Sequence, residues 1–229
     1  VSSRHVIGQL LPDVVFGCLR QAASERTPAE GTSCLYNINM RGRTLGANGA
    51  GAGYVVTAVT NGGTGARPTK DGLSATAYPS GVRASPIEIL ESIAPLVFWR
   101  KELRPDSGGA GRQRGGLGVR RSYNILKDNV LITTNSDRHE SSPWGLAGGL
   151  DAGRTTFTVY RDNQEIRVPG ASNIECRKGD RFVIEITGGG GYGDPKDRDR
   201  DAVRDDVRCG RITELAAIEI YGLKSLAAE

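Results

Sequence analysis

The chain has 229 residues, of which 38% are hydrophobic and 24% charged, so it can bury the core of one large domain or two small ones. Its longest apolar run, 93–99, spans about seven residues, which excludes a membrane-spanning helix of about 20 residues. The net charge is +4 and the 32 glycines follow no collagen-like period, which excludes a strongly basic chain and a fibrous one.

The first predicted element is a helix over Leu10–Ala23, because its apolar residues recur every three and four positions and form one face. These residues are Leu11, Val14, Val15, Cys18, Leu19 and Ala22. The pair Thr27-Pro28 ends this helix. The β-branched run Tyr54–Thr60 predicts a strand. Pro86–Ala94 fits either a short helix or a buried strand, and the pattern leaves both open.

Short strands predominate from Val97 onward. They are predicted at Val97–Leu103, Val119–Leu126, Val130–Thr134, Thr155–Tyr160, Glu165–Val168 and Arg181–Thr187. Tight turns between them favour antiparallel pairing, because parallel strands need crossovers of about a dozen residues or more. Lys196–Arg208 then predicts a helix with a solvated, charged face, and Thr213 caps a second helix through Tyr221. The predicted fold class is α+β, β-rich with mostly antiparallel short strands, an N-terminal helix and two short C-terminal helices.

The four cysteines, at positions 18, 34, 176 and 209, include no C-x-x-C pair of the kind that binds zinc or exchanges disulfides. We expect buried free thiols in a reducing, cytoplasmic compartment. The first eleven residues lack the basic start and long apolar stretch of a secretion signal. Because the first residue is Val1, we expect either a processed N-terminus or part of a longer chain.

The sharpest local feature is the glycine-rich and arginine-rich segment Leu103–Gly118. Glycines leave backbone N–H groups free to face an anion, and arginines can supply the opposite charge. The candidate anion-binding residues are Arg104, Asp106, Arg112 and Arg114 with Gly108, Gly109 and Gly111. The spacing matches neither G-x-G-x-x-G nor a P-loop. A tight turn whose arginines bind neighbouring backbone is therefore the competing interpretation.

A second glycine loop, Gly188–Gly193, follows a predicted strand and contributes Gly189, Gly190 and Gly191 to the candidate site. A nucleotide-binding loop should open directly into a helix, and Pro195 delays the next helix by several residues. The alternative is a loop that needs positive φ angles and close backbone approach.

The segment Ser136–Glu140 places a hydroxyl, carboxylates, a guanidinium and an imidazole just after a predicted strand. Asp137, Arg138 and His139 are therefore candidate substrate-binding or acid-base residues. Adjacent residues cannot fold onto one another as a catalytic triad does, so a charged turn or an interface contact competes with this interpretation. With only two distant histidines, we expect no metal site in this chain.

Basic residues concentrate between Trp99 and Tyr123, a segment with seven basic residues and two acidic ones. They are Arg100, Lys101, Arg104, Arg112, Arg114, Arg120 and Arg121. The segment lacks the interleaved aromatic residues that stack on nucleic-acid bases. We therefore expect no nucleic-acid partner, and the lack of a long apolar segment predicts no membrane partner.

Five motifs in chain order together resemble the C-terminal half of hydantoinase B proteins. They are Gly62–Gly72, Ser85–Glu91, Leu103–Gly118, Ser136–His139 with Trp144–Gly149, and Gly188–Pro195 with Asp205–Arg208 and Tyr221-Gly222. This family includes B subunits of ATP-dependent N-methylhydantoinases, a region of 5-oxoprolinase, and subunits of acetone and acetophenone carboxylases. The resemblance covers nearly all of residues 1–229 and implies the C-terminal portion of a B-like domain that depends on an N-terminal half.

The resemblance implies a heteromeric ATP-dependent hydrolase of cyclic amides or a ketone carboxylase. A hydantoinase A-like partner would bind ATP and Mg²⁺ and phosphorylate a substrate oxygen, which makes the attached carbon electrophilic. The family's N-terminal half carries an Asp/His-rich stretch expected to bind any catalytic metal, and nothing like it occurs here. The segment Tyr78–Arg83 also departs from the family pattern, which leaves the small-molecule substrate open. A noncatalytic scaffold or interaction subunit is the alternative function.

Overall fold

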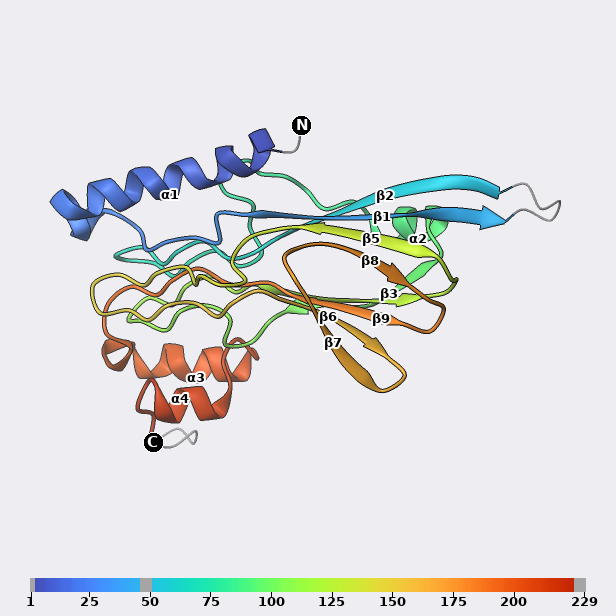
Figure 1. Cartoon of the computed structure of the whole chain (residues 1–229). Coiled ribbons are helices and arrows are strands. Elements are labelled where there is room, and N and C mark those ends of the chain that lie inside the picture. The colour runs from blue at the N-terminus through green and yellow to red at the C-terminus, as the bar shows by residue number, and fades with distance from the viewer. Residues whose placement is uncertain (1–2, 46–50, 225–229) are drawn as a thin grey trace.

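The computed structural model describes residues 3–45 and 51–224 (Figure 1). Its helices are α1 (Ser3–Ala23), α2 (Ile87–Ile93), α3 (Arg200–Arg208) and α4 (Glu214–Glu219), with 3-10 turns η1 (Ser24–Arg26) and η2 (Pro195–Asp197). Its strands are β1 (Leu35–Leu45), β2 (Gly51–Asn61), β3 (Leu96–Leu103), β4 (Val119–Ile125), β5 (Val130–Asn135), β6 (Thr156–Arg161), β7 (Gln164–Val168), β8 (Ala171–Cys176) and β9 (Arg181–Glu185). The predicted α+β, β-rich class is confirmed.

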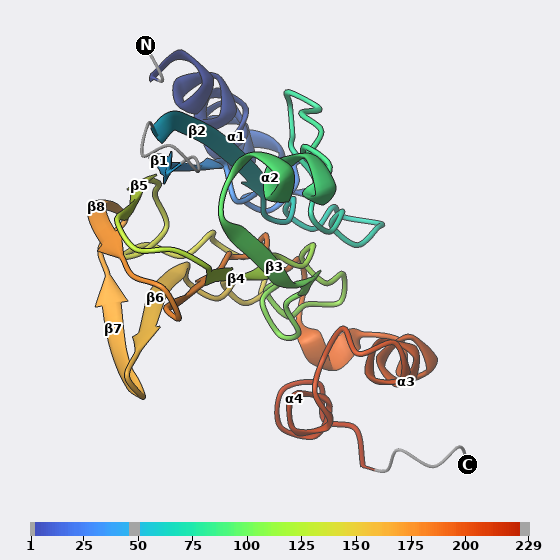
Figure 2. The same ribbon diagram turned by 90° about the vertical axis from the view of Figure 1, so that its right-hand side faces the viewer.

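The strands form two antiparallel sheets that stack face to face (Figure 2). One sheet has the order β2-β1-β5-β8 and the other β3-β4-β9-β6-β7. Alternation along each strand sends every second side chain into the space between the sheets. The largest fully buried side chains of this core include Tyr36, Ile38, Met40, Tyr123, Ile132, Phe157 and Phe182. Burial of these aromatic and branched side chains is the main stabilising contribution of the sandwich.

Two strands of the sandwich were not predicted from the sequence. Strand β1 carries buried Tyr36, Ile38 and Met40 on alternate positions, but asparagines and Gly42 lower its intrinsic strand propensity. Strand β8 pairs with β5 as an edge strand and is mostly polar. The open choice at Pro86–Ala94 resolves as a helix, α2.

Beside the sandwich, glycine-rich segments run between α1 and the C-terminal helices and pack backbone against backbone (Figure 1). We call segments 62–65, 108–118, 145–149 and 188–193 the glycine bundle. A Cβ added to Gly115 would lie 1.8 Å from the Gly189 oxygen, and one on Gly63 would lie 2.0 Å from the Gly116 oxygen. The expected close approach is confirmed. The expected positive φ is wrong for most of the second loop, because only Gly193 in 188–193 adopts it.

Helices α3 and α4 attach to this bundle through a small core and a buried ionic network. Val203, Ala217 and Tyr221 are almost fully buried in that core. Asp206 on α3, 1% exposed, binds Arg114 at 3.2 Å and Arg198 at 2.8 Å.

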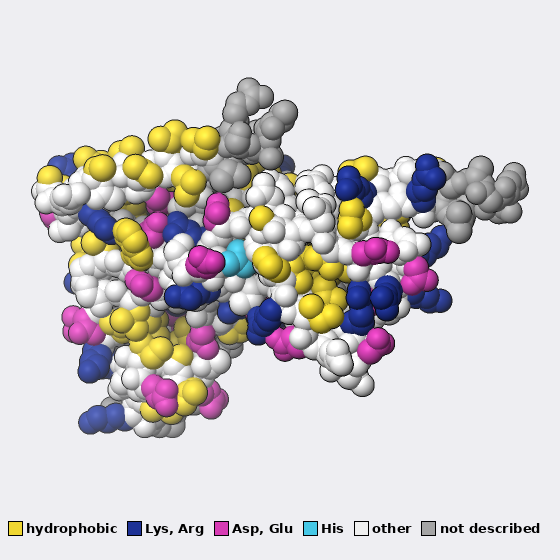
Figure 3. All heavy atoms as spheres, viewed as in Figure 1, with side chains coloured by type: hydrophobic (Ala, Val, Ile, Leu, Met, Phe, Trp, Pro, Cys, Tyr) yellow, Lys and Arg dark blue, Asp and Glu magenta, His cyan; other side chains and the backbone are white. Residues whose placement is uncertain are grey.

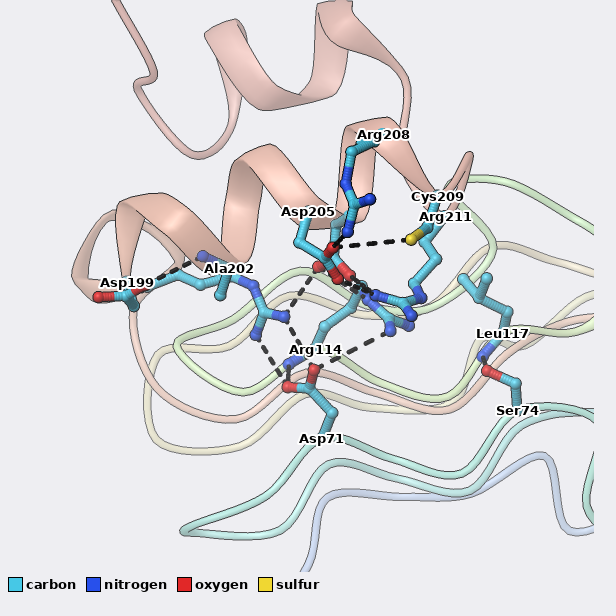
Figure 4. A network of polar contacts seen from close by, with 12 residues as sticks. Asp71, Ser74, Arg114, Leu117, Asp199, Ala202, Asp205, Arg208, Cys209 and Arg211 are labelled. Carbon is cyan, nitrogen blue, oxygen red and sulfur yellow. Dashed lines mark hydrogen bonds and ion pairs between the residues drawn. The ribbon is translucent and has the colours of Figure 1, made fainter. Parts of the chain in front are cut away.

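The same network continues to Asp71, which lies below α3 with Arg114 (Figure 4). Asp71 binds Arg198 at 2.8 Å through both carboxylate oxygens. Burial raises the pKa of Asp71, but the hydrogen bonds and charge of Arg198, with help from Arg114, outweigh it and hold the pKa below its usual range. The expectation that the charges of Lys196–Arg208 are solvated is therefore wrong for Arg198 and Asp206.

Helix α1 exposes its apolar face to solvent. Ile7, Leu11, Val14, Val15 and Leu19 are each about half exposed or more, and hydrophobic side chains line the outer side of this helix in Figure 3. The predicted helix is thus confirmed and begins earlier than expected. A stripe of this kind on a surface helix is a candidate contact for another protein surface.

The cysteine prediction is half right. All four cysteines are free, but only Cys34 and Cys176 are buried, whereas Cys18 and Cys209 are exposed. No helix within residues 3–45 and 51–224 has both the length and the hydropathy to cross a bilayer.

Candidate functional site

The candidate site is a cavity of about 500 Å³ between α1 and three connecting segments, 26–34, 63–68 and 73–78. Much of its wall is apolar, with contributions from Phe16, Pro28, Ala29, Leu73 and Ala77. A volume of this size suits a small organic molecule, and such sites combine apolar walls with a few polar groups.

One polar side of the cavity is formed by Asp13 of α1 and Ser33. The Gly31 amide donates to Asp13 Oδ1 at 3.1 Å, and the Ser33 hydroxyl donates to Asp13 Oδ2. Ser33 is 6% exposed and adopts a left-handed φ of 54°, which is uncommon outside glycine. Burial raises the pKa of the Asp13 carboxyl above its usual range, against the opposing effect of the Ser33 and Gly31 hydrogen bonds. The cavity therefore holds a carboxyl group that gains a proton more readily than an ordinary aspartate.

Arg67, which lies in the motif Gly62–Gly72, forms a second polar side of the cavity, and this side is cationic. Its Nη2 donates to the Asp71 carbonyl oxygen at 2.6 Å. Its Nε is buried and has no hydrogen-bond partner among the residues that the structure describes. A buried N–H without a partner carries a desolvation cost, which a ligand oxygen in this cavity can remove.

The wall segment 30–34 is held from behind by Arg138, one of the predicted site residues. Arg138 donates to the Thr32 carbonyl at 3.0 Å and to Glu30 Oε1 at 2.7 Å. The other Glu30 oxygen accepts from the Trp144 amide at 2.8 Å. Arg138 thus fixes the segment that carries Ser33, and the structure places it behind the wall.

Cys34 also lines the cavity, but as a protonated thiol. It is 5% exposed, and burial raises its pKa to about 11. The thiolate is the nucleophilic form of cysteine, and its population at neutral pH is negligible at this pKa. Cys34 therefore contributes shape to the cavity.

The other predicted arginines bind backbone carbonyls or carboxylates of this chain. Arg104 donates to the Arg154 oxygen at 2.7 Å, and Arg112 donates at 3.3 Å to the oxygen of Pro68, a cavity-lining residue. Arg114 is 4% exposed and belongs to the ionic network under α3. Asp106 accepts from the Thr213 amide at 2.9 Å at the start of α4. These contacts bring Arg112 to the edge of the cavity and leave the other three apart from its lining.

The predicted glycines lie inside the glycine bundle, where their amides bind carbonyls of neighbouring segments. The pairs formed by the candidate glycines are Gly109 to Gly189, Gly189 to Gly116, Gly190 to Glu30 and Gly191 to Leu150, at 2.8 to 3.0 Å. Gly108 and Gly111 pack against the backbone of Gly115 and Tyr192. Anion binding by these loops stays a prediction.

The side chains of the segment Ser136–Glu140 lie in different environments in the structure. Asp137 is exposed, whereas the His139 ring packs edge-on against Phe157 at 4.7 Å between centroids. Ser136 Oγ lies 3.0 Å from His139 Nε2. Burial lowers the pKa of His139, so the neutral imidazole predominates at neutral pH. Arg138 and the Asp137 backbone, which hydrogen-bonds the Cys34 thiol, are the contacts of this segment with the cavity wall.

Sequence reasoning missed Asp13 and Ser33 as site residues. A usable signal was present for Asp13, because it is the single acidic residue in the predicted helix Leu10–Ala23 and lies among mostly apolar residues. No comparable signal marks Ser33, whose role depends on the packing of α1 on the following loop. The described ranges contain no cluster of three or more His, Cys, Asp or Glu side chains suited to a metal ion.

Residues 1–195 match the model of one protein family, Hydantoinase B/oxoprolinase. The chain belongs to this family. It is 33% identical over 217 residues to an uncharacterized protein of Methanocaldococcus jannaschii, covering 94% of this chain and 37% of that protein. It is 30% identical over 223 residues to caprolactamase subunit beta of Pseudomonas jessenii, again with 94% of this chain and 38% of the relative.

Two solved structures share the fold. The crystal structure of the ATP-dependent caprolactamase from Pseudomonas jessenii matches with a TM-score of 0.77 and 28% identity, over 92% of this chain and 38% of the other. Nucleotide-free acetone carboxylase, an enzyme of ATP-dependent acetone carboxylation, matches with a TM-score of 0.73 and 25% identity, over 88% and 31%. This hydantoinase B family chain therefore spans 31 to 38% of the length of these relatives.

Proposed function

We propose that this chain is the C-terminal portion of a B-type component in a heteromeric ATP-dependent enzyme that hydrolyses a cyclic amide. The observation that carries the proposal is the match, over 92% of the chain, to the structure of an ATP-dependent caprolactamase. Relatives described as subunits B and beta support a multi-subunit assembly. In this proposal, an A-type partner binds ATP and Mg²⁺, and the rest of the B component supplies any catalytic metal.

The cavity supports a cyclic amide as the ligand class. A carboxyl group at Asp13 can bind a ring N–H, and Arg67 Nε can donate to the carbonyl oxygen or to a phosphate placed on that oxygen. The apolar wall around Phe16 and Leu73 suits the ring carbons. After the A-type partner phosphorylates the amide oxygen, one water adds to the activated carbon and the ring C–N bond breaks, with the nitrogen leaving as the amine and an acyl phosphate remaining. A second water then attacks this acyl phosphate and releases phosphate and the free carboxylate.

The exposed face of α1 supports dependence on a further polypeptide. Ile7, Leu11 and Val14 follow one another at helical spacing on its solvent side, and the chain is only about a third as long as its relatives. We propose that this face packs against the remaining part of the B component. The same observation favours the second candidate function, a noncatalytic interaction subunit.

The decisive experiment co-expresses the chain with the A-type subunit and remaining B-type portion from the same source and measures ADP release. Hydantoin, 5-oxoproline and caprolactam are the test amides, and acetone with bicarbonate tests the carboxylase alternative. We expect ATP hydrolysis only in the presence of one cyclic amide. ATP hydrolysis that responds only to acetone with bicarbonate would identify a carboxylase instead.

The Asp13→Asn variant separates the catalytic proposal from the scaffold alternative. We expect substrate-dependent ADP release to fall about 100-fold, because the substrate N–H loses its hydrogen bond to a carboxylate, worth about 1.5 to 3 kcal/mol. Lys127→Ala, in an exposed turn, is the control and should leave the rate unchanged. If the assembly forms but Asp13→Asn has no effect on turnover, the chain is a scaffold and the cavity is not the substrate site.

A further inference from the structure

The outer face of the five-stranded sheet carries a groove that has no part in the cavity site. This face of the five-stranded sheet lies opposite the one that packs on the four-stranded sheet (Figure 2). Its volume is about 350 Å³, and the residues that matter below are Trp99, Arg100, Ser122, Tyr160, Arg167 and Arg181. Four arginines and one carboxylate, Glu185, line it, and the adjoining Glu102 and Glu165 pair with Arg100, Arg120 and Arg167. Four guanidinium groups against three carboxylates leave the groove with a small positive excess.

Strand register explains how one row of small residues forms the floor. Ser122 of β4 lies opposite Val183 of β9, which lies opposite Thr158 of β6. The same row continues to Arg100 on β3 at one end and Arg167 on β7 at the other. With strands about 4.8 Å apart, the row is about 19 Å long. The small side chains make the centre of the row low, and a guanidinium group stands at each end of it.

Aromatic rings stand on this face beside the row. A β-bulge between Phe98 and Arg100 allows the consecutive residues Trp99 and Arg100 both to line the groove. The Trp99 side chain is 63% exposed. The guanidinium of Arg181 lies 4.7 Å from the ring centroid of Tyr160, and within the described part of the chain it has no carboxylate partner. Trp, Tyr and Arg are the residue types that dominate binding hot spots between proteins.

An unsatisfied group lies on the groove floor. Ser122 is 3% exposed, and its hydroxyl has no hydrogen-bond partner among the described residues. Its neighbours on β4, Arg121 and Tyr123, are buried on the opposite side, so the hydroxyl belongs to the outer face. A buried hydroxyl flanked by guanidinium groups is suited to a carboxylate oxygen, which accepts from both kinds of donor.

From this groove we infer a docking site for an acidic, extended segment of another subunit. A small metabolite is usually enclosed over 70 to 90% of its surface, whereas this groove lies open across a sheet. Carboxylates of the segment would bind Ser122 together with Arg100, whose 3.7 Å pair with Glu102 lies at the surface. An apolar side chain of the segment would lie over Val183 between the two aromatic rings. The inference rests on the proposed function for the existence of a partner subunit.

Binding is measured by fluorescence in a Trp144→Phe background, where Trp99 is the single tryptophan. The probe is the acetylated, amidated peptide Glu-Thr-Phe-Thr-Glu, whose alternate side chains share one face when extended. We expect saturable quenching with a Kd below about 1 mM, weakening with added salt. Absence of a spectral change up to about 1 mM peptide overturns the inference.

Matched variants assign binding to the groove. Replacing Arg100 and Arg167 together by Glu should weaken binding at least tenfold, and Ser122→Ala about fivefold, because one charge-assisted hydrogen bond is lost. Lys127→Glu makes the same type of charge change in an exposed turn and should leave binding unchanged. If Lys127→Glu weakens binding equally, the peptide responds to the overall charge of the protein and not to the groove, and the proposed docking site is wrong.

Two further probes test the kind of ligand. A peptide with Lys in place of both Glu residues should not bind, and glutarate and inorganic phosphate should bind at least tenfold more weakly than the acidic peptide. Equal binding of glutarate or phosphate would make the groove a small-anion site and overturn the docking segment. Peptide binding requires no turnover, so its result is independent of the ADP-release assay that tests the proposed function.

Discussion

The sandwich and the glycine bundle form their buried interiors in opposite ways, one from large side chains and the other from closely packed backbone. Between the sheets, large side chains such as Phe157 and Phe182 fill the space and stabilise the fold by leaving water. In the bundle, backbones approach so closely that no side chain fits, and amide-to-carbonyl hydrogen bonds join neighbouring segments. The sandwich should therefore be sensitive to lost volume and the bundle to added volume.

The largest effect is expected from Gly115→Ala in the bundle. The new Cβ would lie 1.8 Å from the Gly189 carbonyl oxygen, and backbone on both sides cannot move away independently. We expect a loss of about 5 kcal/mol or more in the free energy of unfolding, measured by chemical denaturation. Gly17→Ala in α1 adds the same methyl group in open space and should stabilise by about 0.5 to 1 kcal/mol. Equal stability of the two variants would contradict backbone packing in the bundle.

The converse test removes volume from the sandwich. Phe182 is fully buried and its ring lies 5.9 Å from that of Phe157. Phe182→Ala should cost about 3 to 5 kcal/mol in the same denaturation experiment, because it removes buried area and leaves a cavity. Val55→Ala, at a side chain that is 70% exposed, should change stability by less than about 0.5 kcal/mol.

A smaller effect is expected where charges fasten α3 to the bundle. Asp206→Asn would leave the buried guanidinium groups of Arg114 and Arg198 with reduced compensation. We expect a loss of about 3 kcal/mol in unfolding free energy. Asp201→Asn is the matched control, because its side chain is 89% exposed in its pair with Arg204 and should contribute almost nothing. A neutral result for Asp206→Asn would show that apolar contacts alone hold this helix.

The smallest effect concerns the cavity and depends on pH. The pKa of Asp13 is raised in the folded state, so the folded chain favours the protonated carboxyl and loses stability as pH rises through that pKa. Asp13→Asn should therefore raise the unfolding free energy by about 1 kcal/mol at pH 7. The gain should shrink as the pH falls through the pKa of Asp13, because the wild-type carboxyl then becomes protonated. A gain that is constant with pH would assign the effect to packing.

The sandwich was largely predictable because its strands are short, branched and separated by turns. Tyr54–Thr60 and Arg181–Thr187 follow this rule, whereas β1 was not predicted because Asn37, Asn39 and Gly42 interrupt its apolar pattern. The glycine clusters marked the bundle correctly as a place of close backbone approach. Their mutual pairing could not be predicted, because it joins segments far apart in the sequence, such as those of Gly109 and Gly189.

The candidate site was harder to predict than the fold. Arg138 was identified, but its neighbours in space are Thr32 and Glu30, more than 100 residues away in sequence. The contact between Asp13 and Ser33 depends on how α1 packs against the loop that carries Ser33. No local sequence pattern predicts this packing. The groove on the outer sheet face likewise depends on strand order, since Arg100 and Arg167 come from the two edges of that sheet.

The bundle also changes how the amides of this chain should exchange with deuterated water. The segments 108–118 and 188–193 lie almost wholly outside any helix or strand, and such regions are ordinarily expected to exchange within seconds. Most of these residues are nevertheless buried, and most of their amides donate to backbone carbonyls or to side-chain oxygens of neighbouring segments. Exchange there should follow global opening of the whole domain, so the slowest protons of this protein include many that belong to what a ribbon drawing shows as loops.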